Sequence, residues 1–186
     1  FVPLPGGSWH AMLDSGYLAQ RAALISPTQS MGQAQAGRFA NTPRMAPSPA
    51  RDNGTTHVTI VDPQGNVVSL TSTVEASMGS YHVTKGFVLN NQLTDFSAAP
   101  AAADGTPIAN RVAAGKRPRS SMAPTLVFDL AENGARGDFR MATGSPGGST
   151  IIQYVSKTLV GALDWGLNAQ QATSMVDFGA TNSPTT

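Results

Sequence analysis

A chain of 186 residues with 40% hydrophobic and 12% charged residues has the balance of a folded domain with a sizeable core. Its formal net charge of +1 comes with scattered Lys and Arg residues, which excludes an extended nucleic-acid-binding stripe. The absence of cysteine excludes disulfides, thiolate catalysis and zinc–thiolate sites, and no apolar run reaches the roughly 18 residues of a membrane helix.

The first 54 residues predict one short helix followed by a linker. Apolar residues recur at a rough helical spacing over residues 8–25, and Ser8 is suited to cap that helix. Residues 26–54 contain four prolines among Gly, Ser, Gln and Asn, with few large apolar residues. This composition is typical of a linker, and a regular pattern resumes only at Thr55.

A β-hairpin is predicted directly after the linker. Residues 57–62 alternate between apolar and polar side chains, residues 63–66 carry a turn signal, and residues 67–74 form a second apolar-rich run. A third strand is predicted over residues 86–90, and the Ala-, Pro- and Gly-rich residues 97–115 predict a loop.

The C-terminal half predicts two more strands and then helices. The strands cover residues 123–130 and 138–143, with a polar turn between them. After the sequence GSPGGS (144–149), apolar residues recur at helical spacing from Ile151 toward Trp165. Asn168 is suited to cap a further short helix. Strands followed by helices indicate an α+β layered fold.

Thr55 is a candidate nucleophile because it stands where the linker meets the first strand. A backbone cut before Thr55 would give it a free α-amino group with a pKa of about 8. That amine can act as the base for the Thr55 hydroxyl without a His or Asp partner. The alternative is that Thr55 is an ordinary first residue of a strand. The three histidines show no metal-ligand spacing.

The GSPGGS turn and three polar positions form a second set of candidates. Glycines at a helix N-terminus leave backbone N–H groups that can hold an oxyanion, although taken alone they favour a tight strand-to-helix turn. Ser120 and Ser121 are suited to bind a carboxylate, and Asp95 is suited to bind an ammonium group. All three are also ordinary loop and turn residues. A phosphate loop is disfavoured because Ser149 stands where the Walker lysine belongs.

Four motifs in this order resemble the gamma-glutamyltransferase (gamma-glutamyltranspeptidase) family of N-terminal-nucleophile hydrolases. They are TTHVTIVDPQGNVVSLTST (55–73), LNNQLTDFS (89–97), GKRPRSSMAPTLV (115–127) and TGSPGGS (143–149). The resemblance covers essentially the whole chain. It implies a precursor that cuts itself into a large and a small subunit, here at the Gly54–Thr55 bond.

The resemblance also assigns a role to each candidate residue. Thr55 would be the catalytic nucleophile, Thr73 would support it, and the N–H groups of Gly147 and Gly148 would form the oxyanion hole. Both charged groups on the α-carbon of the substrate's glutamyl group would be bound. The residues implied for its α-amino group are Glu75, Gln92 and Asp95, and those for its α-carboxylate are Ser120 and Ser121.

The family's organisation sets further expectations. Residues 1–54 would be the tail of the large-subunit segment, and residues 55–186 the small-subunit catalytic segment, truncated at its C-terminus. The fold would be part of a four-layer αββα sandwich, completed by the missing large-subunit segment. The substrates would be gamma-glutamyl compounds such as glutathione, without a cofactor, metal or nucleic acid, and the location periplasmic or extracellular.

Two alternatives remain open at this point. A related acylase that acts on glutaryl-type side chains would share the fold and the nucleophile. The chain would also fit a non-catalytic, unprocessed fragment that lacks its large-subunit half. The joint presence of Gln92, Asp95, Ser120 and Ser121 favours an amino-acid-like glutamyl donor over a glutaryl group.

Overall fold

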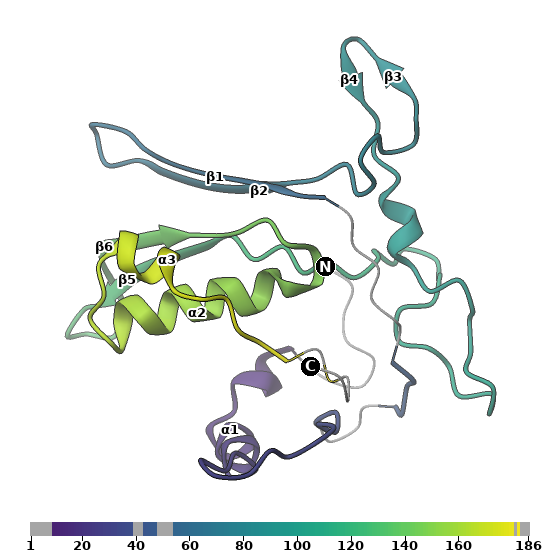
Figure 1. The fold of residues 1–186 in the computed structure, drawn as a ribbon, viewed down its shortest axis with the longest axis horizontal. Coiled ribbons are helices and arrows are strands. Elements are labelled where there is room, and N and C mark those ends of the chain that lie inside the picture. The colour runs from purple at the N-terminus through teal and green to yellow at the C-terminus, as the bar shows by residue number, and fades with distance from the viewer. Residues whose placement is uncertain (1–8, 39–42, 48–53, 181, 183–186) are drawn as a thin grey trace. The chain divides into compact units, whose positions relative to one another are not determined.

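The computed structural model describes residues 9–38, 43–47, 54–180 and 182, and it contains both helices and strands (Figure 1). The predicted α+β class is therefore confirmed. The chain divides into two compact units. Unit 1 consists of Phe1–Ser48, Ser97–Arg117 and Ala180–Thr186, and unit 2 of Pro49–Phe96 and Pro118–Gly179.

Unit 1 begins with a 3-10 helix, η1 (Trp9–Leu13), and a short α-helix, α1 (Ser15–Ala22). The prediction of one helix over residues 8–25 was therefore wrong in its bounds. Asp14 is extended between the two elements, and its carboxylate accepts the N–H of Tyr17 at 2.7 Å as an N-cap. Ser8, the predicted cap, lies outside the described residues.

The rest of unit 1 is largely irregular. The predicted linker is described at residues 26–38, 43–47 and 54, and these parts form no helix or regular strand; residues 39–42 and 48–53 lie outside the description. Residues 97–115 form a loop, as predicted, with isolated bridges in place of strands. One bridge joins Ala46 to Ile108, and Ile108 is the buried hydrophobic residue among those described in this unit.

Unit 2 opens with the predicted hairpin, formed by β1 (Thr56–Val61) and β2 (Val67–Ser72) in antiparallel register. The turn depends on Asp62, whose carboxylate accepts the N–H of Gln64 at 2.9 Å and that of Asn66 at 2.8 Å. The Asn66 side chain donates a third hydrogen bond at 2.7 Å. Gly65 has a φ of 82°, which few other residues adopt without strain.

The two faces of this hairpin differ in polarity. The pairs Val58–Leu70 and Ile60–Val68 place four apolar side chains on one face, and all four are exposed. The opposite face carries mainly polar side chains. Ser69 on this face donates its hydroxyl to the carbonyl of Thr143 in β6 (Arg136–Thr143) at 3.2 Å. The polar face of the hairpin thus lies against the rest of unit 2.

Two short elements follow the hairpin. The strand predicted over residues 86–90 is confined to β4 (Phe87–Val88), which pairs with β3 (Val83–Thr84) across a tight turn. A 3-10 helix, η2 (Gln92–Asp95), comes next and was not predicted. This short helix places Gln92 and Asp95 on one turn, three residues apart.

The C-terminal part of unit 2 matches the predicted order of elements. β5 (Thr125–Leu130) pairs with β6, and the rings of Phe128 and Phe139 contact each other edge to face at 5.8 Å between centroids. Each hairpin of the described chain forms its own two-stranded sheet, so the described residues contain no multi-stranded layer.

Helices close unit 2. A 3-10 turn, η3 (Gly148–Thr150), leads into α2 (Ile151–Leu163), and α3 (Ala169–Ser174) packs against α2. Asn168 caps α3 in a capping box, as its position predicted. The buried apolar residues of this unit are Ile151, Val155 and Ala172. In the described part of the chain no helix has the length and apolar character that crossing a membrane requires.

The hairpin turn gives a first prediction. Hydrogen bonds to Asp62, first from the Asn66 side chain and then from its backbone N–H, hold the pKa of the Asp62 carboxyl below its ordinary value of 3.8. A lowered folded pKa means that this stabilisation is fully present above the unfolded value and is lost as the pH falls through the folded value.

We therefore expect an NMR titration to give a midpoint for Asp62 below 3.8, and amide exchange in β1 and β2 to accelerate below that midpoint. In Asn66→Ala the midpoint moves up toward 3.8, because the largest cause of the shift is removed. A midpoint at or above 3.8 in the unmodified chain would contradict the described turn.

Candidate active site

All of the predicted site residues except Gly147 line one small cavity of unit 2. The cavity has a volume of about 20 Å³, and its lining also includes Gly54, Met122 and Ile151. This volume has room for about one water molecule. We call it the polar recess. The predicted residues that line it are Thr55, Thr73, Glu75, Gln92, Asp95, Ser120, Ser121 and Gly148.

The predicted cleavage point lies at the edge of this recess. Thr55 directly precedes β1, and Thr73 directly follows the partner strand β2, so the hairpin brings the two residues together. The Thr73 hydroxyl donates a hydrogen bond to the carbonyl of Gly54, and it accepts the N–H of Glu75 at 2.8 Å. The carbonyl of the predicted cleavage bond, that of Gly54, therefore already accepts a hydrogen bond from a hydroxyl group.

Glu75 is held in an unusual backbone conformation beside Thr73. Its φ is 70°, in the left-handed region that favours Gly and Asn, and only 6% of the residue is exposed. The next residue is anchored by Asn91, whose side-chain oxygen accepts the N–H of Ala76 at 3.0 Å. Strained conformations of this kind are found at sites where the surrounding structure fixes them.

A second carboxylate reaches the recess from η2. Asp95 is 6% exposed, and its Oδ2 accepts a hydrogen bond from the side-chain amide of Gln92. Glu75 and Asp95 are thus two buried carboxylates in one small recess whose lining contains no Lys, Arg or His. Carboxylate oxygens accept hydrogen bonds, and an ammonium group is a donor that they can bind.

The two serines lie on the segment that leads into β5. The Ser120 hydroxyl oxygen accepts the N–H of Met122 at 3.2 Å, which gives the segment a local turn. Both hydroxyls belong to the lining of the recess. They add two neutral hydroxyl groups to a lining that also contains carboxylates.

The glycine turn has a conformation that other residues cannot adopt without strain. Gly147 has a φ of 138° and Gly148 a φ of 57°. A Cβ atom on Gly147 would come within 2.6 Å of the Tyr154 ring, so the ring packs directly on the glycine backbone. The Gly147 carbonyl accepts the Thr150 hydroxyl at 2.6 Å, which fixes the turn to the start of α2.

A larger cavity of about 580 Å³ lies next to the polar recess. Gly54, Thr55 and Gly148 line both cavities, whereas Gly147 lines only the larger one. Its size is in the range of small-molecule sites, which is about 300–1,000 Å³. Thr55 therefore stands where a small, polar recess and a larger cavity meet.

His57 was not predicted as a site residue, and its ring connects β1 to Gly144 before the glycine turn. Its Nδ1 lies 2.9 Å from the Thr71 hydroxyl and its Nε2 lies 3.0 Å from the Thr59 hydroxyl. The ring lies so close to Gly144 that a Cβ atom there would overlap it. The only sequence signal was the position of His57 on the polar face of the hairpin.

The arrangement is suited to acyl transfer at Thr55, with an acidic recess on one side and a glycine turn on the other. The described residues contain no group of three or more His, Asp or Glu side chains that could hold a metal ion. The lining itself offers hydroxyl groups, backbone N–H groups and two carboxylates.

Comparisons with known proteins give one consistent family. A family model described as gamma-glutamyltranspeptidase matches residues 1–186. The glutathione hydrolase proenzyme of Escherichia coli (strain K12) is 35% identical over an alignment of 186 residues, which covers 96% of this chain and 29% of that protein. The glutathione hydrolase proenzyme of Bacillus subtilis (strain 168) is 36% identical over 182 residues, covering 92% of this chain and 28% of that protein.

A solved structure adds to these relatives. The gamma-glutamyltranspeptidase from Pseudomonas nitroreducens, complexed with L-DON, matches with a TM-score of 0.52 and 36% sequence identity. The match covers 63% of this chain and 61% of that one. The chain thus spans less than a third of the length of the two curated relatives, of which 29% and 28% are covered.

The contact between His57 and Gly144 gives a second prediction. Gly144→Ala forces the His57 ring out of place and should lower the free energy of unfolding by about 1–3 kcal/mol, as overpacking does. In a His57→Ala background the added methyl group has room, so the same substitution should cost much less.

The measurement is a double-mutant cycle with urea denaturation of the four proteins. Additive effects of Gly144→Ala and His57→Ala would show that the two residues do not contact each other.

Proposed function

Because the chain belongs to the gamma-glutamyltranspeptidase family, we propose that it is the central piece of a self-processing enzyme that cleaves gamma-glutamyl amides such as glutathione. One observation carries the proposal. A hydroxyl donor, Thr73, is already bonded to the Gly54 carbonyl, and the adjacent Thr55 lines an acidic recess. The same groups act first in cleavage of the chain and then in cleavage of the substrate.

Self-processing begins at the Gly54–Thr55 bond. The Thr55 hydroxyl attacks the Gly54 carbonyl carbon, and the Thr73 hydroxyl stabilises the oxyanion that forms there. Collapse breaks the bond between that carbon and the Thr55 nitrogen, which takes up a proton, and the acyl group is left as an ester on Oγ1. Water then hydrolyses the ester. The products are the Gly54 carboxylate and a free amine on Thr55 that can act as a base.

Processing also prepares the substrate site. With the bond intact, Gly54 lines the polar recess, whose volume of about 20 Å³ is too small for a glutamyl group. Cleavage frees Gly54 to leave its hydrogen bond with Thr73. We expect the recess to enlarge when this residue moves away.

The ammonium and the carboxylate on the α-carbon of the glutamyl group are then bound by separate side chains. Its ammonium binds Glu75, Gln92 and Asp95, two of which are buried carboxylates. Its carboxylate binds the hydroxyls of Ser120 and Ser121, and the scissile amide is held beside Thr55. The N–H groups of Gly147 and Gly148 act on the oxyanion. A glutaryl group lacks the ammonium that these carboxylates require, so a glutaryl acylase is disfavoured.

The reaction proceeds through a covalent intermediate. Thr55 displaces the amine of the donor amide and forms a glutamyl ester, and the free α-amine of Thr55 moves the proton. Water or the amine of an amino acid or peptide then attacks the ester, which releases glutamate or a new gamma-glutamyl amide. We expect this activity from the complete precursor and not from the fragment alone.

The exposed apolar face of the β1–β2 hairpin supports a two-part organisation. Residues 1–54 would belong to the large subunit and residues 55–186 to the small subunit. The missing large-subunit segment would cover the four exposed side chains, which are otherwise an aggregation liability. That segment would also complete the four-layer αββα sandwich. A periplasmic or extracellular location stays a prediction from the family.

Substitution of Thr55 tests the central claim. In the precursor with its flanking segments restored, Thr55→Ala should stop both backbone cleavage and glutamyl-anilide hydrolysis, with a loss of about 10³-fold or more. Thr55→Ser should keep part of each activity, because the hydroxyl remains while the methyl group that restricts its rotamer is lost. Cleavage is followed on a gel and hydrolysis by release of the anilide.

The matched control is Thr56→Ala. This variant leaves the nucleophilic hydroxyl of Thr55 in place, so it should be cleaved and active. Normal cleavage in Thr55→Ala would contradict the proposed function.

Thr73 gives a separate prediction about the first step. Thr73→Val keeps the shape of the side chain but removes the donor to the Gly54 carbonyl, so cleavage should slow by about 10²-fold. Thr73→Ser should stay within about tenfold of the unmodified precursor, because it retains the hydroxyl. The rate is measured as the decay of intact precursor after synthesis, and equal rates for the valine and serine variants would exclude this role for Thr73.

A further inference from the structure

The larger cavity beside Thr55 has one charged residue in its wall. The other lining residues are glycines, Pro146, two serines, Thr55 and Tyr154, whereas Asp177 carries a carboxylate. The Asp177 side chain is 55% exposed. A ligand in this cavity therefore meets neutral groups on most sides and a negative charge on one.

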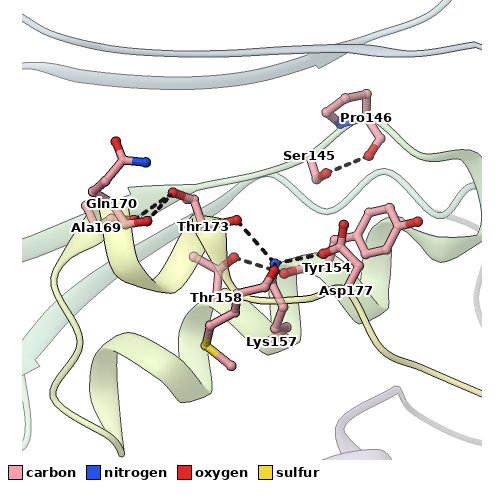
Figure 2. A network of polar contacts seen from close by, with 10 residues as sticks. Ser145, Pro146, Tyr154, Lys157, Thr158, Ala169, Gln170, Thr173 and Asp177 are labelled. Carbon is pink, nitrogen blue, oxygen red and sulfur yellow. Dashed lines mark hydrogen bonds and ion pairs between the residues drawn. The ribbon is translucent and has the colours of Figure 1, made fainter.

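A buried lysine holds Asp177 in this position. Lys157 lies on α2 with only 4% of its side chain exposed, and its Nζ lies 2.7 Å from Oδ1 of Asp177. The same ammonium donates to the carbonyls of Met175 at 2.9 Å and Thr173 at 3.4 Å, as Figure 2 shows. These carbonyls belong to the C-terminal end of α3, where a cation is favoured.

The orientation of this ion pair decides what the cavity presents to a ligand. The ammonium of Lys157 is shielded from solvent and shared among three oxygens, while the carboxylate of Asp177 reaches the cavity wall. Only Oδ1 takes part in the described bond with Lys157. The carboxylate is thus nearer to a ligand than its counter-ion is, so the wall attracts positive charge.

Tyr154 adds an aromatic surface to the same cavity. It stands one turn before Lys157 on α2, and its ring is held against Gly147. Figure 2 draws both Tyr154 and Asp177, and both line the cavity. A carboxylate together with an aromatic ring is a combination that binds ammonium groups well.

We propose that Asp177 determines the specificity for the second substrate and selects acceptor amines that carry an additional cationic group, such as basic amino acids. The inference rests on the proposed function. The neutral amine of the acceptor attacks the carbonyl carbon of the glutamyl ester, and the ester bond to Oγ1 of Thr55 breaks as the new amide bond forms. The amine proton passes through the Thr55 α-amine to Oγ1, while the acceptor's second ammonium group binds Asp177.

The test compares two acceptors of equal length, lysine and norleucine, at one fixed pH in the precursor with its flanking segments restored. The readout is the ratio of their kcat/KM values for glutamyl transfer from a glutamyl anilide. We expect the unmodified enzyme to prefer lysine. Asp177→Asn should lower the ratio by roughly fivefold, the size of effect that one partly exposed ion pair supports.

Two further variants make the result decisive. Lys157→Met/Asp177→Asn removes both charges and leaves no buried ammonium without its partner, so it should fold and should lose the preference for lysine as well. Asp138→Asn removes an exposed carboxylate that lines neither cavity, and it should keep the preference.

The outcomes separate this inference from the function on which it rests. Absence of anilide release by the unmodified enzyme in water, without any acceptor, would overturn the proposed function and the inference together. Anilide release without a preference for lysine would overturn the role of Asp177 alone. So would an unchanged ratio in the Lys157→Met/Asp177→Asn variant.

Discussion

The contact between the His57 ring and the Gly144 backbone is the constraint on which the rest of the site depends. His57 lies in β1, two residues after Thr55. Gly144 directly follows the last residue of β6 and precedes the glycine turn. The ring therefore connects the strand that follows Thr55 to the segment that leads into the glycine turn. The hydrogen bond from Ser69 to Thr143 adds a second connection between the same two hairpins.

This arrangement explains why the polar face of the β1–β2 hairpin lies inward. Polar side chains are accepted in a packed position when their hydrogen bonds are satisfied. Both ring nitrogens of His57 have hydroxyl partners on the hairpin itself, at Thr59 and Thr71. The face is thus satisfied locally, and the apolar side chains are left to the outer face.

In the proposed function, the two cavities would bind the two reactants on either side of Thr55. Buried carboxylates and serines line the polar recess, and Asp177 with Tyr154 lines the larger cavity. Thr55, Gly54 and Gly148 are common to both linings. A nucleophile at such a junction can receive an acyl group from one side and release it to a molecule on the other.

The sequence by itself determined the elements whose signals are local. The hairpin, the strands β5 and β6, the helix α2 and the Asn168 cap of α3 were all predicted, because periodicity and capping act over a few residues. The set of site residues came from the order of four motifs and their resemblance to a family. Composition and periodicity did not reveal it.

The tertiary structure alone decided the features that depend on distant parts of the chain. Lys157 belongs to an apolar helix pattern and gave no sign of being buried, and Asp177 gave no sign of lining a cavity with Thr55. The left-handed backbone of Glu75 and the contact of His57 with Gly144 were equally hidden. The Lys157–Asp177 pair and the contact of His57 with Gly144 require segments to meet that are apart in sequence, and side-chain patterns within one segment carry no information about such a meeting.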